Sequence, residues 1–157
     1  MQRALVLPLA ALLLVAGCRG PGLIPAPESG SVVVDSETAL TLRRRADGFY
    51  LRLAGRRFNT LETYGDRIMR EHFREPTLFL DYYADLAQGF EDADFEKRRP
   101  LRVEVREFVF ESPSAAEVQV RFVGEDARPL RPIPVEMIRS DRWEWSEGTW
   151  WIQPGKL

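Results

Sequence analysis

The sequence predicts an α+β fold in which helices come first and an antiparallel sheet follows. Between residues 36 and 89, apolar side chains recur every three or four positions, the period of amphipathic helices. After Pro100 the period changes to two, which is typical of half-buried strands. With 157 residues, of which 45% are hydrophobic, the chain can form a domain with a core. We therefore expect N-terminal helices packed on the concave side of a curved four-stranded sheet.

Three helices are expected. The first begins at residues 35–36, which can cap a helix, and ends at Gly55. The second begins near residues 59–60, and the third begins at Pro76 and ends at Gly89. Their apolar faces are Ala39, Leu42, Ala46, Phe49 and Leu53 in the first helix, Leu61, Tyr64 and Ile68 in the second, and Leu78, Tyr82 and Leu86 in the third. Each helix thus has one face to bury against the sheet.

Four strands are expected to follow one another in a meander. Apolar and charged residues alternate over 101–106 and again over 117–122, and a third strand runs from Ile133 to Trp145. The segment 146–148 is a short turn whose glycine can adopt positive φ, and the last strand covers 149–153. Alternation places Trp143 and Trp145 on one face of the sheet, and Trp150 and Trp151 on opposite faces.

The first 17 residues have the features of an export signal. Arg3 precedes an apolar run of about 13 residues, from 4 to 16, where roughly 20 are needed to span a bilayer. The next residues, Val15-Ala16-Gly17-Cys18, resemble the lipobox of bacterial lipoproteins, and Cys18 is the only cysteine. The resemblance implies cleavage after Gly17, a thioether-linked diacylglycerol on Cys18, and acylation of the new amino terminus, commonly by palmitate. The alternative is an ordinary secretory signal.

Three segments therefore follow along the chain: a signal peptide (1–17), a lipidated cysteine with a tether (18–34), and a folded domain (35–157). The tether is rich in proline, glycine and serine, which favour neither a helix nor a core. Cys18 is expected to hold the protein to a membrane of the cell envelope. By the enterobacterial sorting rule, Arg19 favours the periplasmic face of the outer membrane if the host is Gram-negative.

The folded domain resembles the nuclear transport factor 2-like superfamily, whose cone-shaped α+β domains are also called SnoaL-like. The resemblance rests on the opening helix around Phe49, the strands from Leu101 onward, and the tryptophan-rich closing hairpin at 142–152. It implies a cone over residues 36–157. Members include isomerases and cyclases with an Asp or His inside the cone as proton shuttle, and members often pair through the open sheet face. Some members insert a strand pair between their helices, and this sequence lacks such a pair.

The cone suggests an apolar pocket with tyrosine hydroxyls as its few polar groups. Its candidate lining residues are Phe49, Tyr64, Tyr82, Met137 and Trp143. The alternative is that these aromatic side chains form the core and clamp the hairpin.

Catalytic residues are harder to assign. His72 is the only histidine and lies near the end of the second expected helix, where the helix C-terminus would favour its charged form. Asp81 and Asp85 are four residues apart but lie beside the apolar face of the third helix. The acidic segment 91–96 lacks the spacing of a calcium-binding loop. We assign no catalytic residue, metal site or cofactor.

The function expected from these observations is that of an envelope lipoprotein. The formal net charge of −2 argues against nucleic-acid binding. Basic clusters such as 43–45 are interpreted as solvated faces, or alternatively as contacts to anionic lipid headgroups. We expect a non-catalytic domain that binds a partner protein or a small apolar ligand. The alternatives are an isomerase- or cyclase-type enzyme with Tyr and Asp in the cavity, and a homodimer formed through the sheet face.

Overall fold

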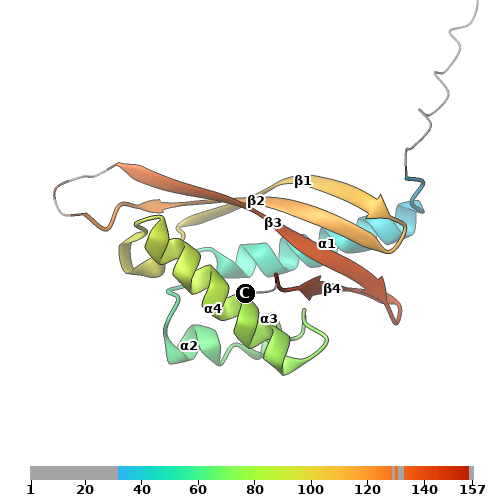
Figure 1. The fold of residues 1–157 in the computed structure, drawn as a ribbon, viewed down its shortest axis with the longest axis horizontal. Coiled ribbons are helices and arrows are strands. Elements are labelled where there is room, and N and C mark those ends of the chain that lie inside the picture. The colour runs from blue at the N-terminus through green and yellow to red at the C-terminus, as the bar shows by residue number, and fades with distance from the viewer. Residues whose placement is uncertain (1–31, 129, 131–132, 156–157) are drawn as a thin grey trace, which may run out of the picture. The chain divides into compact units, whose positions relative to one another are not determined.

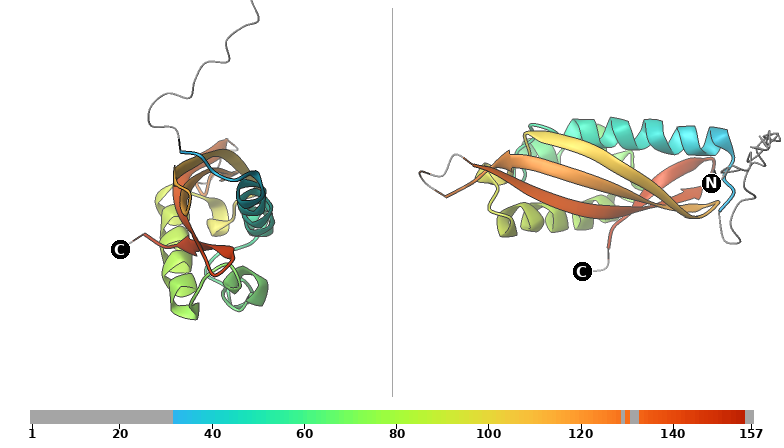
Figure 2. Two further views of the ribbon diagram at one scale, coloured as in Figure 1. Left: turned by 90° about the vertical axis from the view of Figure 1, so that its right-hand side faces the viewer. Right: turned by 90° about the horizontal axis from the view of Figure 1, so that it is seen from above.

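The computed structural model describes residues 32–128, 130 and 133–155, so the predicted signal peptide, Cys18 and most of the tether lie outside the described residues. The elements are α1 (Ser36–Leu53), α2 (Leu61–Tyr64), α3 (Arg67–Arg70), α4 (Pro76–Asp92), the 3-10 helix η1 (Glu96–Arg98), β1 (Arg102–Ser112), β2 (Ala115–Glu125), β3 (Pro134–Ser146) and β4 (Thr149–Gln153). The strands form one antiparallel sheet in the order β1-β2-β3-β4. The sheet curves over the helices, which lie on its inner face (Figures 1 and 2). The α+β prediction is confirmed.

Helix α1 matches its prediction closely. The carboxylate of Asp35 caps it by accepting from the backbone N–H of Thr38 at 2.9 Å. Gly55, two residues after the helix, has φ of 75°, which glycine adopts without strain. The buried face consists of Leu42, Ala46, Phe49, Tyr50 and Leu53. Full burial of each large apolar side chain contributes roughly 1.5–3 kcal/mol, so this face fixes α1 against the sheet.

The second helix differs from its prediction. The chain forms two four-residue helices, α2 and α3, because Gly65 ends the first and Asp66 caps the second. Its Oδ1 accepts from the backbone N–H groups of Ile68 (3.0 Å) and Met69 (3.1 Å). Such side-chain to backbone hydrogen bonds compete with a continuous helix. The break rotates the second turn, so Met69 is buried, whereas the apolar face predicted for this segment is exposed: Leu61, Tyr64 and Ile68.

Helix α4 does not end at Gly89 as predicted but continues to Asp92. The residue after Gly89, Phe90, is fully buried, and its burial favours continuation of the helix. Gly89 instead allows close packing on β3, since a Cβ there would lie 3.2 Å from Sδ of Met137. The glycine thus serves helix–sheet contact and not helix termination.

The strands have the predicted alternation. The inner residues of β2 are fully buried: Ala116, Val118, Val120 and Phe122. Trp150 is buried and Trp151 half-buried on the opposite face of β4, as predicted. The β3–β4 turn has positive φ at Glu147 (54°) and Gly148 (78°), the pattern of the favoured two-residue hairpin turns. Strands β1 and β3 begin one residue later than predicted, and a bulge between Val105 and Glu107 shifts the register of β1.

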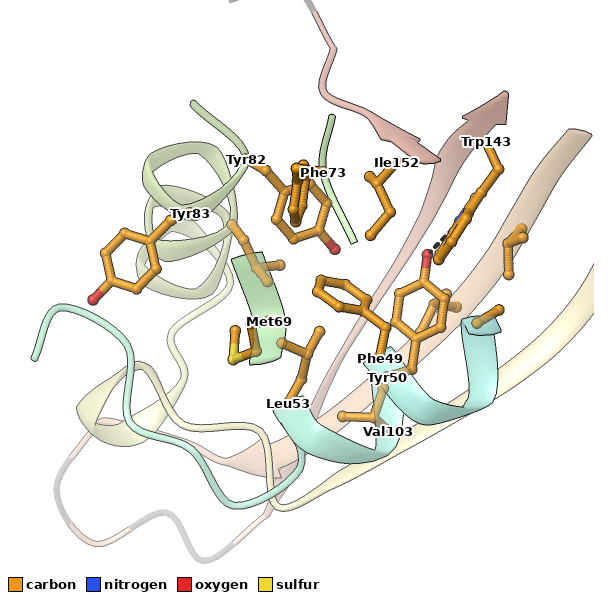
Figure 3. Close-up of a cluster of buried hydrophobic side chains, with 14 of the residues drawn as sticks. Phe49, Tyr50, Leu53, Met69, Phe73, Tyr82, Tyr83, Val103, Trp143 and Ile152 are labelled. Carbon is orange, nitrogen blue, oxygen red and sulfur yellow. Dashed lines mark hydrogen bonds between the residues drawn. The ribbon is translucent and has the colours of Figure 1, made fainter. Parts of the chain in front are cut away.

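One cluster of buried apolar side chains fills the space between helices and sheet (Figure 3). Aromatic rings dominate it, and most of them pack edge-to-face or tilted. Within residues 32–155, no described helix is both long enough and apolar enough to cross a membrane.

Candidate functional site

Three of the five predicted pocket residues meet in the core. The ring of Phe49 lies 5.6 Å from that of Tyr82 and 6.3 Å from that of Trp143, centroid to centroid, in edge-to-face contacts. All three side chains are at most 1% exposed (Figure 3). The ring of Phe49 also contacts those of Tyr50, His72 and Phe73. Phe49 thus occupies the centre of the helix–sheet interface.

The other two predicted pocket residues lie elsewhere. Tyr64 is 41% exposed, and its ring packs edge-to-face on Tyr83 at 5.7 Å. These two tyrosines line a separate hollow of about 270 Å³. Met137 is half-buried on the inner face of β3, beside Gly89 of α4. The five residues therefore do not line a common space.

A polar cluster within the core was not predicted. Asp141 on β3 is 3% exposed, and its Oδ2 accepts from the hydroxyls of Tyr50 and Tyr82, each at 2.7 Å. Its Oδ1 accepts from Nε of Arg139 at 2.6 Å. The indole N–H of Trp143 donates to the Tyr50 oxygen at 3.2 Å, the bond drawn in Figure 3. We call Tyr50, Tyr82, Arg139 and Asp141 the Asp141 cluster.

Arg139 connects this cluster to the surface. Its Nη1 donates to Oδ2 of Asp85 on α4 at 2.9 Å. Its guanidinium lies 4.9 Å from the ring centroid of Tyr82. Although burial by itself lowers the pKa of Arg139, the neighbouring Asp141 and Asp85 carboxylates raise that pKa overall. Arg139 therefore stays charged between two carboxylates.

The tyrosines stay protonated. Burial, together with the nearby Asp141 carboxylate, raises the pKa of Tyr50 and of Tyr82 well above the usual 10. Both hydroxyls are thus permanent donors, and both oxygens of Asp141 are engaged by them and by Arg139.

The sequence contains a signal for this cluster. Met137, Arg139, Asp141 and Trp143 occupy every second position of β3, so all four belong to the inner face. Polar residues at inward positions of a strand must be paired in the core. Tyr50 directly follows the central Phe49, and Tyr82 and Asp85 are three residues apart on α4. The partner of each polar residue, however, comes from a distant segment.

An open cleft of about 790 Å³ lies beside the cluster. Its lining consists of Asp85 on α4, Arg139, Ser140, Asp141, Arg142 and Glu144 on β3, and Gln153, Pro154 and Gly155 at the end of β4. The cleft begins where β4 ends, because β4 pairs only with Arg142–Ser146. Among the described residues, no strand pairs with the preceding part of β3 on that side. Asp85 and Asp141, whose carboxylates Arg139 holds, therefore line a cleft that adjoins a free strand edge.

The remaining candidates are placed separately. Asp81 is exposed, and His72 is only 9% exposed. Nδ1 of His72 lies 3.0 Å from the carbonyl oxygen of Ile68. Burial and the neighbouring Arg45 lower the pKa of His72, and they outweigh the helix end, whose carbonyls at Ile68 and Met69 favour the charged imidazole as expected. No group of three or more metal-ligating His, Cys, Asp or Glu side chains occurs among the described residues.

The arrangement can thus hold fixed charges at an open edge of the sheet. No family model matches this chain, and no curated protein or solved structure is found to be similar to it.

Proposed function

We propose that the protein is a lipid-anchored, non-catalytic binding protein of the bacterial cell envelope. Its folded domain is a nuclear transport factor 2-like cone, and it binds a segment of a partner protein at the cleft beside β3. One observation carries this proposal: the cleft combines a free strand edge with charged groups that are already immobilised. A free edge offers backbone N–H and C=O groups to an extended peptide. Preformed charges bind without the entropy cost of ordering them.

A polar protein segment fits this site better than a small apolar ligand does. The centre of the cone is taken by the Phe49 ring and its aromatic neighbours. The cleft instead is lined by charged side chains of both signs, among them Arg142 and Glu144. Such a lining favours backbone amides and charged side chains over hydrocarbon.

Photo-crosslinking in the native host tests the site. A crosslinking residue at Ser140, which lines the cleft, is expected to give a discrete protein adduct, whereas the same residue at the exposed Leu51 of α1, outside the cleft, is expected to give none. Arg142→Glu should reduce the Ser140 adduct, and Arg106→Glu on the distant β1 should not. Identical adducts from Ser140 and Leu51, or insensitivity to Arg142→Glu, would contradict the proposal.

The enzyme reading has one observation in its favour: the carboxylate bound by two tyrosine hydroxyls also lines the open cleft. An isomerase or cyclase could use such hydroxyls as proton donors. Tyr82→Phe separates the two readings. If the protein is an enzyme, Tyr82→Phe abolishes the cellular function while the Ser140 adduct persists. If it is a binding domain, the cellular function and the Ser140 adduct are either both lost or both retained.

A homodimer through the sheet face is less well supported. On that face Arg121 forms ion pairs with Glu104 (3.0 Å) and Glu136. A second copy on this surface would remove these charges from water, which costs several kcal/mol per ion unless each is paired again. A dimer seen by light scattering that Arg121→Gln dissociates would restore the dimer reading.

The anchor has its own test. Cys18→Ser should release the protein from the membrane fraction, because the chain then lacks the lipid attachment site. In a Gram-negative host, Arg19→Asp should move the protein from the outer to the inner membrane. Normal processing and membrane association of Cys18→Ser would show that the lipid assignment is wrong.

A further inference from the structure

A second hollow lies away from the cleft and is basic. Its volume is about 380 Å³, and its lining residues are Thr41, Arg44, Arg45 and Gly48 on α1, Ile68 and His72 from α3 and the turn after it, and Thr149 at the start of β4. We call this hollow the Arg44–Arg45 pocket. Three separate elements converge on it, so its shape is set by the fold and not by one flexible loop.

Arg45 is held in place without a carboxylate partner. Its Nε donates to the carbonyl oxygen of Trp150 at 2.5 Å, and its Nη2 to the carbonyl oxygen of Glu71 at 2.5 Å. The guanidinium also lies over the ring of Trp151, 5.2 Å from the centroid. Burial lowers the pKa of Arg45, which indicates a cation partly removed from water. The carbonyls orient this charge but do not cancel it, and the Glu71 carboxylate acts on it only from beyond ion-pair distance.

The nearby acids are paired with other arginines. Asp47 pairs with Arg43 at 3.8 Å, and Glu71 pairs with Arg67 at 3.7 Å. Glu147 in the β3–β4 turn pairs with Arg74 at 3.7 Å. Among the described residues, neither Arg44 nor Arg45 has a carboxylate within ion-pair distance. The pocket therefore keeps two positive charges that an anion can neutralise.

The space for that anion comes from Gly48. A Cβ built at Gly48 meets no atom within 4 Å, so the space beside this lining residue of the pocket is open. The hydroxyls of Thr41 and Thr149 at the rim add hydrogen-bond donors. Two guanidinium groups with hydroxyls around a small concavity match the oxygens of a phosphate group, which arginine binds through paired N–H donors.

We propose that the Arg44–Arg45 pocket binds a phosphate group, from either a phospholipid headgroup or a soluble phosphate. This site is separate from the cleft, so its test does not depend on the proposed partner. In the lipid-anchored protein, Cys18 is 14 residues before Val32, a span of at most about 50 Å. The domain therefore remains close enough to the membrane for either source.

The test uses the full-length lipidated protein in micelles of a non-ionic detergent that contains no phosphate. In one arm inorganic phosphate is titrated at constant ionic strength; in the other, phosphatidylglycerol is added to the micelles. Tryptophan fluorescence reports binding, because Trp151 contacts Arg45. Saturable binding in the first arm identifies a site for soluble phosphate, and binding in the second arm alone identifies a headgroup site.

Three variants separate the pocket from general charge attraction. Arg44→Gln should weaken binding about tenfold, the effect of losing one charged hydrogen bond. Gly48→Leu should abolish binding by filling the hollow without changing the charge. Arg43→Gln removes a neighbouring charge already paired with Asp47 and should have less than about a threefold effect. Equal losses in Arg43→Gln and Arg44→Gln, unchanged binding in Gly48→Leu, or no binding in either arm would overturn the proposal.

Discussion

The two faces of the sheet hold arginine–carboxylate clusters of similar geometry in opposite surroundings. On the inner face, Arg139 donates to Asp141 at 2.6 Å, and the Asp141 side chain is 1% exposed. On the outer face, Arg121 donates to Glu136 at 2.9 Å, and the Glu136 side chain is 43% exposed. The bond lengths differ little, so access to water determines how much stability is lost when one partner of each pair is removed.

Removal of one partner has different consequences on the two faces. A buried charge that loses its partner cannot be rescued by water and stays uncompensated. An exposed charge is solvated as soon as its partner leaves. The inner cluster should therefore respond strongly and as a unit to substitution, and the outer ion pairs weakly and one at a time.

The largest effect is expected for Asp141→Ala. This change leaves the Arg139 guanidinium with one carboxylate, Asp85, and leaves the hydroxyls of Tyr50 and Tyr82 without their acceptor. Breaking a buried pair on one side costs about 3–5 kcal/mol of unfolding free energy. Urea denaturation followed by tryptophan fluorescence measures it.

A double variant serves as the control. Arg139→Met with Asp141→Leu replaces both charges by apolar groups of similar size, which is often neutral or stabilising. We expect it to be more stable than Asp141→Ala. If both variants are equally destabilised, the cost comes from altered packing and not from an uncompensated charge.

The second prediction concerns the tyrosines of the inner cluster. Tyr82→Phe removes one donor to a buried carboxylate and should cost about 2 kcal/mol at neutral pH. The pKa of Tyr82 is raised in the folded state, so its contribution is complete below the unfolded value of about 10 and is lost as the pH rises above it. Tyr82→Phe should thus also flatten the loss of stability above pH 10. An unchanged alkaline profile would show that Tyr82 ionises normally in the fold.

Local signals in the sequence were sufficient for most of the architecture. The cap at Asp35, the turn at Gly148 and the alternation along β2 each act within a few residues, and each was predicted correctly. The prediction of one continuous helix from Leu61 to Arg70 was wrong, because Asp66 accepts hydrogen bonds from the backbone N–H groups of Ile68 and Met69. Periodicity alone does not register that competition.

The candidate site was predicted only in part. Phe49, Tyr82 and Trp143 do come together, as their inward positions indicate. The Asp141 cluster joins residues up to 91 positions apart, and no local pattern identifies Tyr50 as the partner of Asp141. The Arg44–Arg45 pocket was visible only as a run of basic residues, since its hollow depends on how α1 packs beside β4.

The smallest effect is expected on the outer face, for Arg121→Gln. The hydrogen bond from Arg121 is the main reason that the pKa of Glu136 lies below its usual value. That contribution is present above about pH 4.5 and is lost as the pH falls through the lowered value. In Arg121→Gln, an NMR titration should show the pKa of Glu136 returning toward normal, while the urea midpoint at pH 7 moves less than in Tyr82→Phe. Added salt should reproduce part of this pKa change in the wild type, because exposed pairs are screened. A urea midpoint shifted as far as that of Asp141→Ala would mean that the ion pairs of Arg121 stabilise the folded state as much as the Asp141 cluster does. Access to water would then not explain the difference between the two faces.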